Sequence, residues 1–274
     1  MGGSIRYIAQ MPQPLAASYH FTVLEETDEW LAVNKPAPLQ IHPSKPSDAG
    51  LTLWDGLREL LRYELVNGGQ VSLINRLDRE TSGVVLVAKT GCTARELGKA
   101  MMRRQMRKSY LAIVHGWPEW EQLEVSQPIL RQGDVMESRV WVKQRVHPDG
   151  AHCLTEFRVL KRFGKNIAGR GVEKFALVEA EPHTGRMHQI RVHLQFTGHC
   201  VVGDKLYGVD EGCYLEFMET NWTPSLQSRL LLPRQALHSH TLEVKTPELQ
   251  HRWTAPLTED LEKFVAEEVA SIVM

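Results

Sequence analysis

The sequence NRLDRETSG at residues 75–83 leads directly into the apolar run VVLVA at residues 84–88. The apolar run is short, continuous and rich in β-branched residues, which predicts a strand buried on both faces. The nine residues before it hold four ionisable side chains, two hydroxyls and a glycine. This composition is costly in a core and typical of a loop that carries a site. A surface turn with local hydrogen bonds would have the same composition, so the loop alone does not decide between the two.

Strand patterns occur on both sides of this region. Residues 21–34, FTVLEETDEWLAVN, predict a hairpin, because β-branched and aromatic residues flank a Thr-Asp turn. The prolines that follow at Pro36 and Pro38 predict a loop as far as His42-Pro43. Further strands are expected at Tyr110–Val114, Glu137–Gln144, Thr155–Leu160, Phe175–Glu181 and Leu237–Val244.

Two helices are expected among these strands. Apolar residues recur at helical spacing from Leu51 to Leu65, before Asn67-Gly68-Gly69 ends the pattern. Thr93 followed by Glu96 has the form of a capping box, which predicts the start of a helix that carries basic residues as far as Lys108. Many strands with few long helices predict the α+β class: a mixed, mostly antiparallel sheet with flanking helices and loops.

The chain of 274 residues has no internal repeat and no Gly-, Ser- or Pro-rich linker. We therefore expect one catalytic domain over residues 1–274, with its core at about residues 20–250. Residues 208–233 show little periodicity and are expected to form a surface insertion.

The composition, 42% apolar and 24% charged, is that of a folded globular protein and excludes the fibrous, disordered and membrane classes. The four cysteines have neither disulfide-framework nor zinc-ligand spacing. Residues 1–13 lack a signal pattern, and no apolar run approaches the roughly 20 residues of a membrane helix, so we expect a cytoplasmic protein with no membrane association.

The net charge of −1 does not indicate a polyanion partner, so any such surface must come from local clusters of basic residues. Either of two basic clusters could equally be a solvated face. The first comprises Arg95, Lys99, Arg103, Arg104, Arg107 and Lys108, and the second comprises Arg158, Lys161, Arg162, Lys165, Arg170 and Lys174.

A second polar segment, HTGRMHQIRVHL at residues 183–194, follows a predicted strand. His188 and His193 are five residues apart, which does not fit the i, i+4 pair of a zinc hydrolase, so no metal site is expected. The plain alternative for this segment is a helix N-terminus with satisfied polar groups.

The motifs together resemble the RluA-type family of RNA pseudouridine synthases. Residues 75–83 resemble its [HN]-R-L-D-x-x-T-S-G motif. Its other segments are matched, in family order, by LAVNKPAPLQIHP at 31–43, KSYLAIVHG at 108–116, GRMHQIRVHL at 185–194, GDKLYG at 203–208 and ALHSH at 236–240. Asn75, Ala37, Pro38 and Met187 depart from the commoner family residues. The N-terminal S4 module frequent in the family is expected to be absent, because too few residues precede Phe21.

The resemblance implies an enzyme that isomerises uridine to pseudouridine in structured RNA without a cofactor. It assigns Asp78 as the catalytic carboxylate, Arg191 as its cationic partner and Tyr110 as the residue that stacks on the uracil. Ile190 and Leu237 would line the pocket. Arg76 would fill the space vacated by an extruded base, while Arg103, Arg104 and Arg107 would contact phosphates. The expected partner is a stem-loop of ribosomal or transfer RNA, bound by a monomer.

Two other functions are compatible with parts of the pattern. Asp78 and Glu80 could form the carboxylate pair of a glycosidase. Alternatively, the chain could be a catalytically silent RNA-binding protein of the same fold, although Asp78, Tyr110 and Arg191 are all present.

Overall fold

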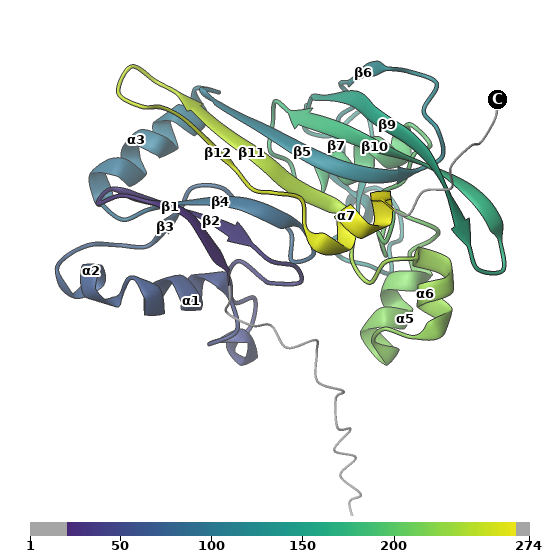
Figure 1. Ribbon diagram of the computed structural model, residues 1–274, viewed down its shortest axis with the longest axis horizontal. Coiled ribbons are helices and arrows are strands. Elements are labelled where there is room, and N and C mark those ends of the chain that lie inside the picture. The colour runs from purple at the N-terminus through teal and green to yellow at the C-terminus, as the bar shows by residue number, and fades with distance from the viewer. Residues whose placement is uncertain (1–20, 267–274) are drawn as a thin grey trace, which may run out of the picture.

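The computed structural model describes residues 21–266 (Figure 1). The predicted lack of a signal sequence at residues 1–13 and the predicted absence of an S4 module concern residues outside this range. Among residues 21–266, no helix has both the length and the apolar character needed to cross a membrane.

The described part of the chain contains both strands and helices. The strands are β1 Thr22–Glu26, β2 Trp30–Lys35, β3 Ser72–Leu73, β4 Ser82–Ala88, β5 Met106–His115, β6 Gln122–Val125, β7 Ile129–Arg131, β8 Gln144–Val146, β9 Thr155–Ile167, β10 Gly171–Pro182, β11 Leu237–Lys245 and β12 Gln250–Thr254. The α-helices are α1 Leu53–Leu60, α2 Arg62–Val66, α3 Gly91–Met102, α4 Gln189–Phe196, α5 Gly212–Thr220, α6 Pro224–Leu230 and α7 Glu259–Ala266. Short 3₁₀ helices span Pro46–Asp48 and Gln132–Asp134.

A ten-stranded sheet runs through the molecule in the order β1-β2-β4-β11-β5-β10-β9-β6, with β3 paired to β4 and β12 paired to β11. The pairing of β4 with β11 is parallel, and the other pairings are antiparallel. Figure 1 shows α3 and the α1–α2 pair at one end of the sheet and α5 and α6 at the other. The predicted α+β class with a mixed, mostly antiparallel sheet is confirmed.

Strand β4 lies near the centre of this sheet, and all seven of its residues are buried. Val85 and Val87 pack into the larger apolar core, whereas Val84, Leu86 and Ala88 pack into a second core on the opposite face. Period-two alternation with apolar cover on both faces explains why its sequence is continuously apolar.

Gly83 joins the polar loop to β4 where β4 meets β11. Its φ of 114° is disfavoured for residues with a side chain, and a Cβ at this position would lie 2.1 Å from the backbone oxygen of Ser239. Glycine therefore allows the loop to enter the sheet directly against β11.

Three predicted elements need correction. The helix expected over Leu51–Leu65 is two helices, α1 and α2, separated at Leu61. The second predicted helix, α3, starts earlier than Thr93, because Thr90 is its N-cap and accepts a hydrogen bond from the Thr93 N–H at 3.2 Å. The strand expected at Glu137–Gln144 is wrong, because only Gln144 belongs to a strand.

The segment 208–233 is also more ordered than expected. It forms α5 and α6, which enclose a small apolar core of Cys213, Leu226 and Leu230. Both helices are short, nine and seven residues, so they give little periodic signal in the sequence.

Candidate active site

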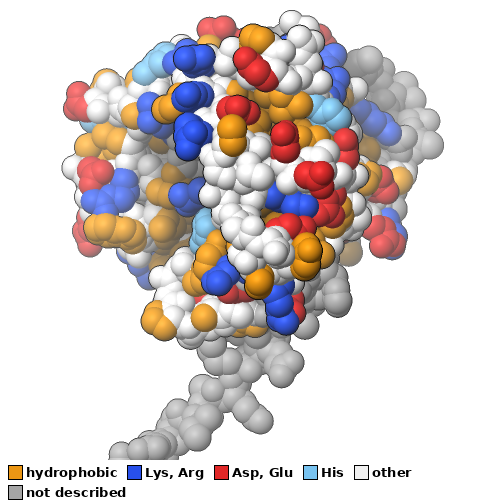
Figure 2. All heavy atoms as spheres, turned by 90° about the vertical axis from the view of Figure 1, so that its left-hand side faces the viewer, with side chains coloured by type: hydrophobic (Ala, Val, Ile, Leu, Met, Phe, Trp, Pro, Cys, Tyr) orange, Lys and Arg blue, Asp and Glu red, His pale blue; other side chains and the backbone are white. Residues whose placement is uncertain are grey.

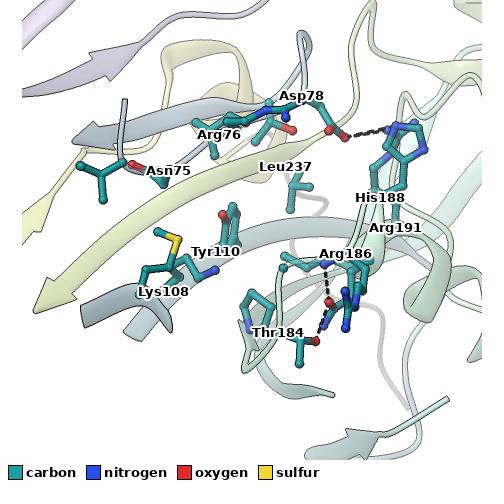
Figure 3. Close-up of a pocket in the computed structure, with 18 residues that line it drawn as sticks. Asn75, Arg76, Asp78, Lys108, Tyr110, Thr184, Arg186, His188, Arg191 and Leu237 are labelled. Carbon is teal, nitrogen blue, oxygen red and sulfur yellow. Dashed lines mark hydrogen bonds and ion pairs between the residues drawn. The ribbon is translucent and has the colours of Figure 1, made fainter. Parts of the chain in front are cut away.

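A cavity of about 280 Å³ opens where the polar loop 75–83, β5, β11 and the start of α4 meet (Figure 3). Six of the predicted site residues line it: Arg76, Asp78, Tyr110, Ile190, Arg191 and Leu237. These side chains come from segments up to 161 positions apart in the sequence (237 − 76), and the fold brings them together. Their catalytic and binding roles stay predictions.

Asp78 projects from the loop between β3 and β4 into this cavity, and its side chain keeps 32% of its surface exposed. A turn holds the backbone that follows Asp78, since the Thr81 N–H donates to the Asp78 carbonyl at 3.1 Å. The carboxylate accepts a hydrogen bond from Arg191 Nη1 at 2.8 Å and a longer one from Gln235 Nε2 at 3.4 Å. The predicted contact between Arg191 and Asp78 is therefore present.

Arg191, on α4, is held mainly by Asp204, a residue for which no role was predicted. Its Nε and Nη2 atoms donate to the two carboxylate oxygens of Asp204 at 2.6 and 2.9 Å. Asp204 is fully buried and also accepts hydrogen bonds from the N–H groups of Leu206 and Tyr207. One guanidinium thus bridges a buried carboxylate and the carboxylate that faces the cavity, using the planar fork that only arginine has.

This pairing determines the charge state of Asp78. Burial alone would raise the pKa of its carboxyl, but Arg191, His188 and the two hydrogen bonds described above hold that pKa below its ordinary value. Burial likewise opposes the charge of Arg191, yet Asp204 and Asp78 raise its pKa. Asp78 is therefore an anion, and Arg191 a cation, throughout the neutral pH range.

His188 lies beside Asp78 in a left-handed backbone conformation, with φ at 57°. Its Nδ1 is 2.8 Å from the Tyr207 hydroxyl, which accepts a hydrogen bond from the Gln144 N–H, also at 2.8 Å. Tyr207 therefore has its own proton to donate to Nδ1, which leaves hydrogen on Nε2, 3.9 Å from the nearer Asp78 oxygen. Burial and the charge of Arg191 lower the pKa of His188 to about 4, so the ring is neutral.

One part of the cavity lining is aromatic and apolar. Tyr110, on β5, is 8% exposed, and burial raises the pKa of its hydroxyl to about 12, so it stays protonated. Ile190 and Leu237 contribute aliphatic side chains from α4 and β11. These side chains form an apolar surface against which a planar ring can lie.

Two lysines that sequence reasoning left without a role anchor the loop that carries Asp78. Lys35 is fully buried and donates to the carbonyls of Pro36, Leu39 and Arg79 at 2.9, 2.8 and 3.2 Å. Lys205 donates to the Glu80 carboxylate at 2.7 Å. Both lie in the family segments quoted above, and the position of Lys35 directly after the largely apolar run 30–34 could have indicated its burial.

The predicted basic helix ends sooner than expected. Helix α3 stops at Met102, the left-handed residue Arg104 turns the chain, and Arg107 belongs to β5. Arg107 pairs with Glu181 at 2.7 Å. By contrast, four cations, Arg95, Lys99, Arg103 and Arg104, have no hydrogen-bond or ion-pair partner among residues 21–266. Figure 2 shows Lys and Arg side chains gathered beside a hollow on one face of the molecule.

Arginines of the second basic cluster are neutralised within the fold. Arg158 pairs with Glu179, Arg162 with Glu121, and Arg170 with Glu173. The two clusters, alike in sequence, therefore differ in their capacity to attract an anion. Within residues 21–266, no group of three or more His, Cys, Asp or Glu side chains is arranged to hold a metal ion.

Comparison with known proteins supplies the class. The model of the RNA pseudouridylate synthase family matches residues 29–196. An uncharacterized RNA pseudouridine synthase of Chloroflexus aurantiacus is 36% identical over 84% of this chain, and the ribosomal large subunit pseudouridine synthase D of Nitrosomonas europaea is 32% identical over 95%. The chain spans 63% and 70% of the lengths of these two relatives.

Among solved structures, human RNA pseudouridylate synthase domain containing 4 has a TM-score of 0.67 at 24% identity, covering 90% of this chain and 92% of its own. That likeness concerns the fold. The chain belongs to the RNA pseudouridylate synthase family, and its resemblance to the RluA-type members is confirmed.

Proposed function

We propose that this protein isomerises uridine to pseudouridine within structured RNA, with Asp78 as the catalytic carboxylate. The observation that carries the proposal is the position of Asp78. Its carboxylate faces the cavity, and Arg191 at 2.8 Å keeps it charged beside an aromatic and aliphatic wall. Family membership adds independent support.

The reaction makes specific demands on such a site. The bond between N1 and C1′ breaks, the uracil turns and C5 joins C1′; the proton on C5 leaves to solvent, and N1 takes up a proton. No redox step or group transfer to an outside acceptor is involved, so the chemistry needs no cofactor. A carboxylate beside the ribose acts either as a nucleophile at C1′ or as a base that removes the C2′ proton. Asp78 suits both roles, and Tyr110, Ile190 and Leu237 would hold the detached uracil while it turns.

The target uridine must leave its stack to reach Asp78, which costs a few kcal/mol of unstacking. Arg76 lines the cavity two residues before Asp78 and is the candidate to occupy the vacated space. Met101, in the last turn of α3, also lines the cavity, and the unpaired Arg103 and Arg104 come two and three residues later in the chain. These cations would track phosphates around the extruded nucleotide.

Ribosomal RNA is the favoured substrate class, because the relative from Nitrosomonas europaea is named for the large ribosomal subunit. A stem-loop bound by a monomer in the cytoplasm completes the proposal. Mapping pseudouridines by carbodiimide-stalled reverse transcription, in cells with and without the gene, would identify the uridine.

A glycosidase is the alternative enzyme class, and the geometry argues against it. Its second carboxylate would be Glu80, but Glu80 pairs with Lys205 at 2.7 Å and does not line the cavity. Incubation with RNA that carries 5-tritiated uridine separates the two classes. A pseudouridine synthase releases tritium to water while the base stays on the RNA, whereas a glycosidase releases free uracil.

A further inference from the structure

Lys108 is a cavity residue to which the proposed chemistry gives no task. It lies on β5 two positions before Tyr110, and residues two apart on a strand face the same side. Figure 3 shows Lys108 beside Tyr110, with its nitrogen directed into the cavity. The intervening Ser109 points the other way and donates to Glu179 at 2.7 Å.

The ammonium of Lys108 has no hydrogen-bond or ion-pair partner within residues 21–266. The side chain is nevertheless partly enclosed, and burial lowers its pKa. An enclosed charge without a partner is unfavourable unless a ligand supplies the opposite charge. The other enclosed lysines of the site, Lys35 and Lys205, do have protein partners.

The space around this ammonium is kept open on the side of the loop between β10 and α4. A Cβ at Gly185 would lie 3.7 Å from Lys108 Nζ, so a longer side chain at that position would occupy the space. The cavity lining includes the cations Arg76, Lys108, Arg186 and Arg191 but only one carboxylate, Asp78, which Arg191 already pairs. The free charge in the cavity is therefore positive.

We propose that Lys108 binds a phosphate that flanks the extruded uridine and so fixes the nucleotide while its base lies against Tyr110. This inference rests on the proposed function. A phosphate fits better than a uracil carbonyl, because it brings the negative charge that the enclosed ammonium lacks. Lys108 is thus a positioning residue, and its task is distinct from that of Asp78.

The test is a cycle of two changes, Lys108→Met in the protein and a methylphosphonate in the RNA. The probe is the RNA stem-loop that carries the mapped uridine, with the neutral linkage placed 5′ or 3′ of it. Affinity is measured in the Asp78→Asn background, so that no product forms. We expect each single change to weaken binding about 10- to 100-fold, the range for a hydrogen bond to a charged group. At one of the two linkages, the two changes together should weaken binding no more than either change does alone.

The matched control is Lys174→Met, which removes the same charge from β10. Lys174 is far from the cavity, because it lies eight residues before the cavity residue Pro182, roughly 25 Å along the strand. The fold-losses of affinity caused by Lys174→Met and by the methylphosphonate should be independent and therefore multiply. If the fold-losses caused by Lys108→Met and by the methylphosphonate also multiply at both linkages, the proposal is wrong. Tritium release by the wild-type protein from unmodified RNA tests the proposed function separately.

A second measurement distinguishes ligand binding from a structural task. Since Lys108 has no partner in the described part of the chain, Lys108→Met should leave the thermal midpoint of unfolding without RNA unchanged or raise it. A midpoint lowered by several degrees would mean that Lys108 supports the fold, and would overturn the proposal.

Discussion

Asp204 holds Arg191 by two hydrogen bonds, at 2.6 and 2.9 Å, and so fixes the guanidinium whose remaining nitrogen reaches Asp78. Arg191 therefore has two tasks: it compensates a fully buried charge and it keeps the cavity carboxylate ionised. Substitutions that separate these two tasks are informative.

Arg191→Ala should destabilise the protein as well as stop the reaction. It leaves Asp204 buried without its cation, a change that typically costs about 3 to 5 kcal/mol. Urea unfolding should show this loss in the free energy of unfolding. A variant that keeps wild-type stability and near-normal single-turnover chemistry, and loses only RNA affinity, would identify Arg191 as a phosphate contact instead.

Arg191→Lys should move the acid limb of the pH–rate profile upward. A lysine keeps the charge but cannot bridge both carboxylates with a planar fork. Burial, which raises the pKa of Asp78, is then less well opposed, so Asp78 protonates at a higher pH and activity is lost earlier as pH falls. Single-turnover rates measured from pH 4 to 8 test this, and an unshifted acid limb would contradict it.

The unpaired basic residues that follow α3 should carry RNA affinity. Replacing Arg103 and Arg104 with Ala should lower the slope of log affinity against log salt by about 0.7 to 0.9 per lost contact. Arg107 should contribute less, because Glu181 already pairs with it. The control replaces Arg162 and Arg170, which are paired within the fold, and should leave the slope nearly unchanged. Equal effects from both pairs would refute the assignment.

His238 should make the protein less stable in mild acid. It is fully buried, and burial lowers its pKa to about 4 from the usual 6.5. Between these values the unfolded chain binds a proton that the folded chain does not, so stability is lost as pH falls from 6.5 to 4, by up to roughly 3 kcal/mol for this group. His238→Gln should flatten that part of the stability curve. An unchanged pH slope in the variant would rule out this contribution.

The sequence predicted the loop that carries Asp78, strand β4 and the residues that meet in the cavity, because family motifs and local patterns mark them directly. It did not predict the role of Asp204, since its contact with Arg191 depends on how the chain folds back over 13 residues. The start of α3 was missed because Thr90 and Thr93 are three residues apart and either hydroxyl could cap a helix. Their hydroxyls in fact contact each other at 2.9 Å.

The false strand at Glu137–Gln144 has a different cause. Its residues alternate in the manner of a strand, with Val140 buried and Trp141 exposed beneath the Arg131 guanidinium. Apart from Gln144, however, they have no neighbouring strand with which to pair. Strand formation depends on a partner strand from any part of the chain, and local alternation cannot supply that information.

The most direct test of Asp78 as the catalytic carboxylate compares Asp78→Asn with Glu80→Gln. Both variants replace a carboxylate of the same loop by its amide. On RNA with 5-tritiated uridine, under single-turnover conditions, Asp78→Asn should release no tritium while it retains its fold and much of its RNA affinity. Glu80→Gln weakens the ion pair with Lys205 that anchors the loop, so its rate should fall in part, but it should still release tritium. Substantial tritium release by Asp78→Asn would contradict the account.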